Sequence, residues 1–255
     1  QLGRKITLKN FNHMKCKHLI FICTVAFAIN SCGGNGSADS MFGKIPSMYE
    51  KTTTDMLQDL SDINKAIKED KNKEKADNNL EKLKEAFQKM EDALKETEKK
   101  ARPYADEMAG KTIPYEQTDS LQYIVISDIT IKEVLLPKIR NLGSEGVKLE
   151  VTFDIKLKKD AKKSSFYIYF LMAGDKGNIG YDKQSIYCAG KKQGDVISVK
   201  TTINAPDVPT SYLNACERLI FVTEDTYYSQ RSKIKKQQEQ WEQTELEKYG
   251  LNETD

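Results

Sequence analysis

Carboxylates are the most frequent groups in this chain that could carry out chemistry. Its 255 residues include 38 Asp and Glu side chains, against 40 Lys and Arg. Paired carboxylates alone can hydrolyse a glycosidic bond, but the acids of the helical segments alternate with lysines, which is the pattern of a solvated face. The sequence contains no glycine-rich phosphate-binding loop. We therefore expect a non-enzymatic protein with no catalytic residues and no cofactor.

A glycine-containing loop near residue 175 brings together oxygen ligands of the kind that calcium prefers. Asp175, Asn178 and Asp182 lie around this loop. Their spacing differs from that of an EF-hand, and the closing glutamate is missing. A plain hairpin turn is the better interpretation, so we expect no metal site.

Tyrosines recur along two neighbouring segments of predicted strand. Tyr167 and Tyr169 share one face of the first segment, and Tyr181 and Tyr187 lie on the next. Aromatic rings arranged in this way can stack against a sugar or a peptide. The alternative is a central strand covered on both faces, with the helical hairpin described below as one cover. The sequence leaves both interpretations open.

A basic and then apolar leader opens the chain. Lys15 and Lys17 precede an apolar run of eleven residues, 19–29. This run is too short to cross about 30 Å of hydrocarbon as a helix, but it suits the core of a signal peptide. It leads to Cys32 and then to a Gly-, Asn- and Ser-rich stretch, so we expect a signal segment at 1–31 and a flexible tether at 32–46. Ordinary secretion or a short buried helix are the alternatives.

The end of this leader resembles the lipobox of bacterial lipoprotein precursors. Ile29 is the branched apolar residue three before Cys32, and Ser31 is the small residue directly before it, whereas Asn30 stands where a small or hydroxyl residue is usual. The resemblance implies that Cys32 is lipidated and becomes the first residue of the mature protein. Two or more acyl chains give stable attachment to a membrane. Gly33 replaces the Asp that signals inner-membrane retention in enteric bacteria, which implies the outer membrane.

Cleavage before Cys32 would change the chemistry of the remaining chain. The segment removed holds both histidines, His13 and His18, with five basic residues and no acid. The mature part keeps 35 basic and 38 acidic side chains, a net charge near −3 that gives no global attraction to nucleic acid. Without histidine, Ser-His-Asp and Cys-His nucleophiles and His-containing zinc sites are excluded. Residues 1–13 precede Met14, and we interpret them as not native.

Two cysteines, Cys188 and Cys216, belong to neither the leader nor the lipidation site. In an oxidising compartment they could form a disulfide between neighbouring strands. They could equally be two buried free thiols, because each lies in an apolar strand context. The sequence leaves this choice open.

Residues 47–102 have the apolar spacing of two amphipathic helices. A charged connector at residues 69–79 separates them, and Pro103 predicts the end of the second. Neither apolar stripe can remain in water, so we expect an antiparallel helical hairpin or coiled coil over 47–110, with one continuous helix as the competitor. Residue 112 should then start a linker. The stripes consist of Met56, Leu60, Ile63 and Ile67, and of Leu80, Leu83, Phe87, Met90 and Leu94.

Residues 119–226 switch to an apolar period of two. The clearest alternation covers 147–158, where every second residue is apolar and those between are charged or Thr. The other strands that we predict are 121–134, 165–172, 179–189, 196–203 and 219–226. Turn residues separate them, as in Gly143 to Gly146. Six or seven such strands without intervening helices predict an antiparallel immunoglobulin-like β-sandwich, and their order resembles small immunoglobulin-like modules of bacterial envelope lipoproteins.

A polar stretch at residues 229–249 predicts a mostly exposed C-terminal helix that docks through Trp241. The expected fold class is therefore α+β. The expected function is that of a membrane-anchored envelope lipoprotein with a binding or structural role, whose helices are a spacer or a surface for an envelope protein. The alternative is a glycan- or peptide-binding module that uses the aromatic face.

Overall fold

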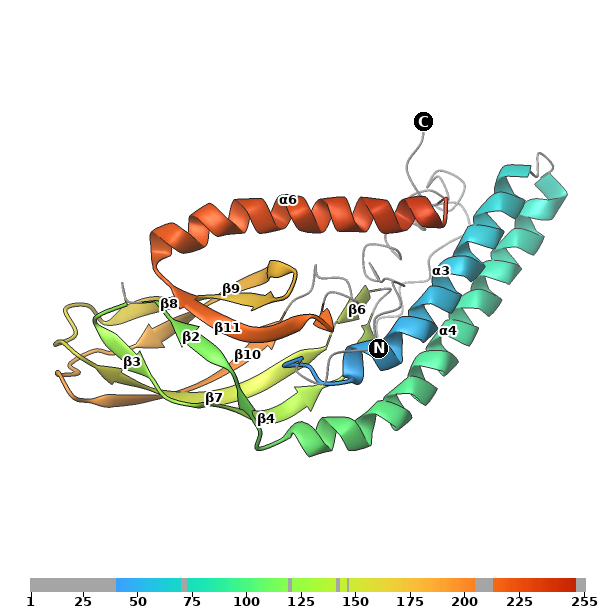
Figure 1. Cartoon of the computed structure of the whole chain (residues 1–255). Coiled ribbons are helices and arrows are strands. Elements are labelled where there is room, and N and C mark those ends of the chain that lie inside the picture. Colours follow the sequence, from blue (N-terminus) through green and yellow to red (C-terminus); the bar gives the residue numbers. More distant parts are fainter. Residues whose placement is uncertain are drawn as a thin grey trace.

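The computed structural model describes residues 40–69, 73–118, 121–140, 143–145, 147–204 and 213–250. It contains two long helices, two stacked β-sheets and a C-terminal helix (Figure 1). The α+β fold class predicted from the sequence is confirmed. Cys32 and the leader lie outside the described residues. Among the described helices, none combines the length and apolar character needed to span a bilayer.

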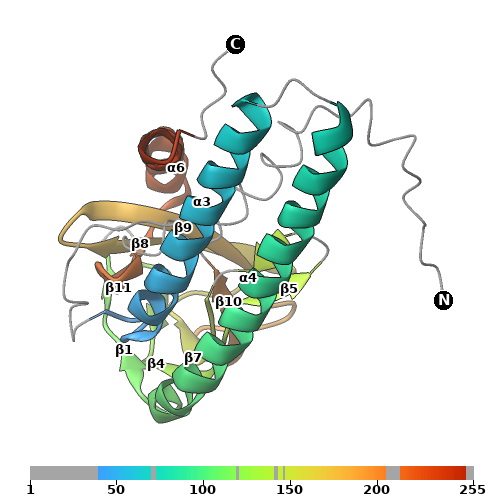
Figure 2. The same cartoon turned by 90° about the vertical axis from the view of Figure 1, so that its right-hand side faces the viewer.

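Helices α3 (Ile45–Glu69) and α4 (Lys73–Met108) lie side by side and run in opposite directions (Figures 1 and 2). A hydrogen bond of 2.7 Å joins the hydroxyls of Thr52 and Thr97 across the pair. The predicted stripe residues Met56, Leu60 and Leu94 are buried, as is Leu57. The chain therefore forms two packed helices here and not one continuous helix.

The segment before α3 is part of the core, so the tether predicted for 32–46 was wrong for residues 40–46. Phe42 and Ile45 are fully buried and Met41 nearly so. The Met41 N–H donates to the Cys216 carbonyl at 2.7 Å, and Ser40 Oγ donates to the Leu213 carbonyl at 2.9 Å. Burial of three large apolar side chains within five residues outweighs the flexibility suggested by the glycines and serines upstream.

Helix α4 also continues past Pro103, which we had predicted to end it. Proline inside a helix removes one hydrogen bond and clashes with the preceding turn. Ala101, Ala105 and Met108 follow helical spacing and are all buried in the main core. Burying this last turn holds the helix together beyond the proline.

Sheet A is antiparallel in the order β1-β4-β7-β10, with β3 also paired to β7. Sheet B has the order β2-β11-β8-β9, in which β2 and β11 are parallel and the other pairs antiparallel. A separate hairpin is formed by β5 and β6. The strands of sheet A are β1 (Thr112–Ile113), β3 (Ile124–Ile126), β4 (Ile129–Leu135), β7 (Lys148–Leu157) and β10 (Val196–Asn204). The others are β2 (Tyr115–Gln117), β5 (Lys138–Arg140), β6 (Gly143–Glu145), β8 (Ser165–Gly174), β9 (Gly177–Tyr187) and β11 (Cys216–Val222).

Three sequence predictions about these strands need correction. The linker expected from residue 112 forms the short strands β1 and β2, and Pro114 between them marks the passage from sheet A to sheet B. The strand expected at 121–134 is divided into β3 and β4. The turn expected from Gly143 is instead strand β6. Strands of two or three residues are too short to produce a periodic signal.

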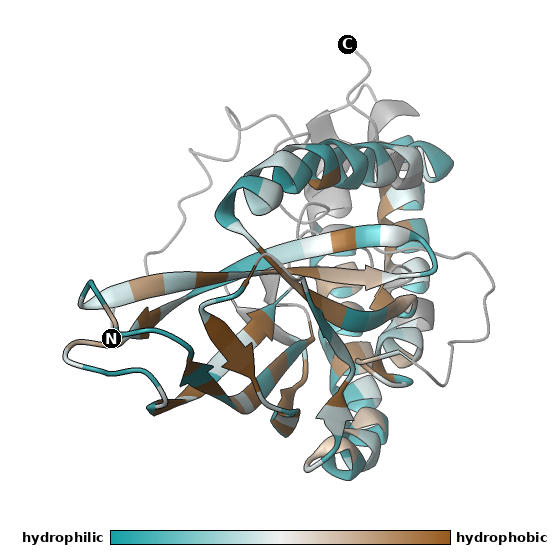
Figure 3. Cartoon of the chain, turned by 60° about the vertical axis from the view of Figure 1, so that its left-hand side comes forward, coloured by the Kyte–Doolittle hydropathy of each residue, from teal (hydrophilic) through white to brown (hydrophobic). Residues whose placement is uncertain are grey.

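The core lies between the two sheets. The alternation predicted for 147–158 is confirmed in β7, where Leu149, Val151 and Ile155 are fully buried. The ring of Phe221 from β11 lies 6.1 Å from Phe153 of β7 and 5.7 Å from Phe170 of β8. Figure 3 shows hydrophobic residues along the strands of both sheets, whereas the C-terminal helix is mainly hydrophilic.

The C-terminal helix α6 (Glu224–Lys248) begins five residues earlier than predicted, in place of the end of the expected strand 219–226. Thr223 caps it, since its Oγ1 accepts the Thr226 N–H at 3.4 Å. Helix α6 packs on the outer face of sheet B through Tyr227 and Ile234. Trp241, the predicted docking residue, is partly buried against the main core and is one contact among several.

Candidate functional site

The outer face of sheet B brings together the four tyrosines noted in the sequence. In the β8–β9 pairing, Tyr169 is opposite Lys183 and Tyr167 is opposite Ser185, while Tyr181 and Tyr187 lie at the two ends of the same row. Cross-strand partners point to the same side of a sheet, and so do alternate residues along a strand. All four rings therefore belong to one face.

Helix α6 covers one half of this face. Tyr169 is only 7% exposed, and its ring centroid lies 4.9 Å from that of Tyr227. Tyr181 is half-buried, 5.9 Å from Tyr227, with the Arg231 guanidinium 5.6 Å from its ring centroid. The cover over this strand is thus α6, and not the helical hairpin that the second interpretation of the sequence suggests.

The other half of the face is open to solvent. Tyr167, Tyr187 and Tyr228 are 47%, 72% and 42% exposed. The ring of Tyr167 lies 6.1 Å from the buried ring of Tyr169, and Lys183 Nζ lies 4.9 Å from its centroid. We call Tyr167, Tyr187, Tyr228 and Lys183 the open tyrosine face. Sequence reasoning missed Tyr228, which lies on the first turns of α6.

The phenols beneath the open tyrosine face are protonated at neutral pH. Burial, and then the Glu224 carboxylate that accepts a hydrogen bond from its hydroxyl, raise the pKa of Tyr169 above its ordinary value. Burial also raises the pKa of Tyr227. A hydrogen bond to Tyr181 raises the pKa of Arg231, which therefore keeps its charge. The arrangement offers flat exposed rings beside two cations, Lys183 and Arg231, which suits stacking and hydrogen bonding to a ligand.

The two cysteines are separate buried thiols, which is one of the two alternatives that the sequence left open. Cys188 Sγ donates to the Lys163 carbonyl at 3.2 Å. Burial raises the pKa of Cys216 to about 12. A thiol held protonated in this way is a poor nucleophile.

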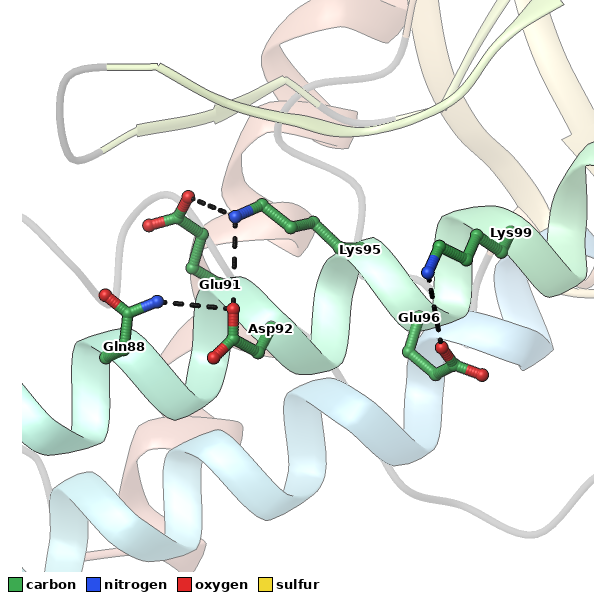
Figure 4. A network of polar contacts seen from close by, with 6 residues as sticks. All are labelled: Gln88, Glu91, Asp92, Lys95, Glu96 and Lys99. Atoms are coloured by element: carbon green, nitrogen blue, oxygen red, sulfur yellow. Dashed lines mark hydrogen bonds and ion pairs between the residues drawn. The ribbon is translucent and has the colours of Figure 1, made fainter.

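Three acids of α4, Glu91, Asp92 and Glu96, pair with lysines on the same helix (Figure 4). Lys95 Nζ lies 2.7 Å from Glu91 and 3.9 Å from Asp92, and Lys99 lies 4.0 Å from Glu96. All these side chains are about half exposed or more. These pairs have the i,i+3 and i,i+4 spacing of a solvated helix face.

The loop considered for calcium is the turn of the β8–β9 hairpin. Gly174 pairs with Gly177 across Asp175 and Lys176, and Gly177 has a φ of 81° that a residue with a side chain rarely adopts. Within the described part of the chain, no group of three or more His, Cys, Asp or Glu side chains is placed to hold a metal ion.

A concave feature lies along the helical pair. It is a groove of about 290 Å³ between α3 and α4, with an apolar floor and charged edges. The floor includes Met56, Leu60, Phe87 and Met90. Asp55 and Asp59 form the edge on α3, and Lys89 and Lys100 belong to the edge on α4.

Comparison of the chain with known protein families, with curated proteins and with solved structures found no match in any of the three.

Proposed function

We propose that this chain is a non-enzymatic binding protein of the cell envelope, tethered to the outer membrane through lipid on Cys32. The support for the tether is the residue pattern from Ile29 to Cys32 that follows a basic and apolar leader. The described part of the chain begins eight residues after Cys32, at a serine bound to the core.

The open tyrosine face carries the proposed binding function. Rings that are nearly half exposed or more, yet in contact with neighbouring side chains, lose little conformational freedom when a ligand stacks on them. Tyr167 is in contact with Tyr169 and Lys183, and Tyr228 lies 5.2 Å from Tyr227. A sugar ring presents apolar C–H groups to such rings and hydroxyls to the neighbouring polar groups. Glycans are therefore the ligand class that we propose, ahead of peptides.

A glycan array probed with the full chain in detergent tests this function. We expect a defined set of glycans to bind, and Tyr167→Ala to reduce all of their signals. An array without signal, or one on which Tyr167→Ala binds as well as the unaltered chain, would remove the support for a glycan-binding face.

Metabolic labelling with a fatty-acid probe tests the tether separately. We expect the chain to incorporate the probe and the Cys32→Ala variant to lose it. Cys16→Ala is the matched control, because it removes a thiol on the other side of the cleavage point. Lipid incorporation by the Cys32→Ala variant would contradict the proposal.

The groove between α3 and α4 favours a second candidate function for the helical pair. We propose that the pair, as a coiled coil, is a spacer or a surface for another envelope protein. Met90 on the groove floor is half-buried, so Met90→Glu should weaken such a contact. Cross-linking of solubilised envelopes should give one product that this variant loses and that the exposed Lys84→Glu control keeps. A chain that stays uncross-linked would argue for a spacer alone.

For the sandwich we propose an immunoglobulin-like type. Support comes from its two facing sheets, its mostly antiparallel pairing and the packing of Phe153 and Phe170 on Phe221.

A further inference from the structure

One end of the sandwich concentrates positive charge. Two loops meet there, residues 158–164 after β7 and residues 188–195 between β9 and β10. They contain six lysines against two aspartates, an excess of four positive charges, and all six lysines are exposed. The part of the chain from Cys32 onward has a net charge near −3. The positive charge of these two loops is therefore opposite in sign to the net charge of that part. We call the six residues the lysine end: Lys158, Lys159, Lys162, Lys163, Lys191 and Lys192.

Backbone hydrogen bonds fix the two loops to one another. The Ala161 N–H donates to the Lys191 carbonyl at 3.0 Å, and the Cys188 N–H donates to the Ser164 carbonyl at 2.8 Å. The two loops therefore hold a fixed position relative to one another, and their lysines form a single surface.

The two aspartates of these loops form their hydrogen bonds and their ion pair within the loops. Asp160 accepts the Gln193 N–H at 2.9 Å and forms an ion pair of 3.5 Å with Lys192. Asp195 accepts the Lys192 N–H at 2.9 Å. Among the described residues, the other five lysines form no ion pair. Their charge is available to a ligand.

The lysine end adjoins the open tyrosine face. Tyr187 directly precedes the second loop and pairs with Ser165, which directly follows the first. The Lys158 N–H donates to the carbonyl of Tyr123, whose ring is 38% exposed. Exposed rings and unpaired cations thus lie together at one end of the molecule.

This end points away from the place where the chain enters the sandwich. Met41 is bound to Cys216, and Cys216 pairs with Gly174 at the far end of β8. Strand β8 extends over ten residues from Ser165 to Gly174, so its two ends lie about 30 Å apart. In Figure 1 the two loops lie on the opposite side of the sandwich from the helical pair. If Cys32 holds the chain to a membrane, the lysine end faces away from that surface.

We propose that the lysine end and the open tyrosine face together bind an acidic polysaccharide. The lysines would pair with carboxylate groups along the polymer, and the tyrosines would stack on its rings. This inference rests on the proposed glycan-binding function and adds the charge of the ligand. An anionic membrane surface is the competing ligand, and the direction of the lysine end argues against it.

Binding of the full chain in detergent to polygalacturonate, and to the same polymer with its carboxylates methyl-esterified, tests the proposal. We expect binding to the acid form and at least about tenfold weaker binding to the ester. Changing four of the lysines to Gln (Lys159, Lys162, Lys163 and Lys191) should weaken binding to the acid about 600-fold, since each cation near an anionic surface contributes roughly fivefold. Changing the same four lysines to Arg should preserve binding to the acid form.

The matched control changes four exposed lysines of the helical pair to Gln, at Lys65, Lys82, Lys84 and Lys99, with the same change in net charge. We expect it to bind polygalacturonate like the unaltered chain. Equal loss in both quadruple variants would show a net-charge effect and overturn the proposal. Equal binding to acid and ester would also overturn it, but would leave the glycan-binding function intact.

Failure to bind either polymer would overturn the inference, and an empty glycan array would then count against the proposed function as well. Binding of the full chain to vesicles that contain phosphatidylglycerol is the last measurement. Tighter binding of the chain to these vesicles than to polygalacturonate, with the same dependence on the four lysines, would identify the membrane as the ligand and refute the polysaccharide.

Discussion

The outer faces of the two sheets differ in polarity, and therefore in whether they need a cover from water. On sheet A, the outward residues of β7 are polar, and Glu150 forms an ion pair of 2.8 Å with Lys200 while Asp154 accepts the Ser198 hydroxyl at 2.7 Å. On sheet B, the outward residues include Tyr169, Leu171 and Val222, which are buried. A polar face can remain in water, whereas an apolar face needs a cover.

The cover on sheet B is incomplete, and this distinguishes a structural tyrosine from one free to bind. Tyr169 and Tyr167 are two residues apart on the same face, yet they are 7% and 47% exposed. The difference arises because α6 begins above Tyr169 and extends away from Tyr167. We infer that the covered rings stabilise the fold and the uncovered rings serve recognition.

Tyr169→Ala should have the largest effect on stability. It removes a buried ring from the contact with Tyr227, so we expect the free energy of unfolding to fall by about 4 kcal/mol. Tyr169→Phe keeps the ring and loses the hydrogen bond to Glu224, at a cost of about 1 kcal/mol. Urea denaturation measures both values. A loss below about 1 kcal/mol for Tyr169→Ala would show that α6 does not make this ring part of the core.

Gln238→Ala tests how α6 is fixed to the sheet, and it should have the next largest effect on stability. The buried Gln238 Nε2 donates to the Ile179 carbonyl of β9 at 2.9 Å. Without it that carbonyl loses its partner, and we expect a loss of about 1–2 kcal/mol in denaturant unfolding. Gln240→Ala, two residues along on the exposed side, is the control. Equal effects of the two substitutions would contradict the docking of α6.

Tyr167→Ala should change stability by less than about 1 kcal/mol, since nearly half of the side chain is already in water. The comparison with Tyr169→Ala in the same denaturation series gives the contrast between the two halves of the face. A loss for Tyr167→Ala as large as that for Tyr169→Ala would mean that both rings are structural.

Lys156→Gln on the outer face of sheet A should have the smallest effect, within about 0.5 kcal/mol. Lys156 is exposed and alternates with the buried Ile155 and Leu157. A larger loss would show that the polar face of sheet A carries an unrecognised contact. Thermal denaturation of the purified variant is sufficient to detect it.

The sequence predicted the regular parts of this fold. Alternation over ten residues of β7 placed Leu149 and Ile155 in the core, and helical spacing placed Met56 and Leu94 there. The start of α6 was missed because Thr226, Tyr227 and Tyr228 favour strands. The capping residue Thr223, followed by two acids, was the signal that could have identified it.

The candidate site could be predicted only in part. A period of two puts Tyr167 and Tyr169 on the same face, but local pattern cannot show which of them a helix more than fifty residues away will cover. The two loops of the lysine end are likewise separated in the chain by β8 and β9. Their charges become one surface through the pairing of Ser165 with Tyr187 and the backbone hydrogen bonds between the loops.

The double variant Tyr167→Ala/Tyr187→Ala tests the central claim, that the uncovered tyrosines bind ligand and do not hold the fold. Its glycan-array signal and its thermal midpoint should be measured beside those of the unaltered chain. We predict that the array signal is lost while the midpoint stays within about 3 °C. An unchanged array signal, or a midpoint lowered as far as that of Tyr169→Ala, would contradict the claim.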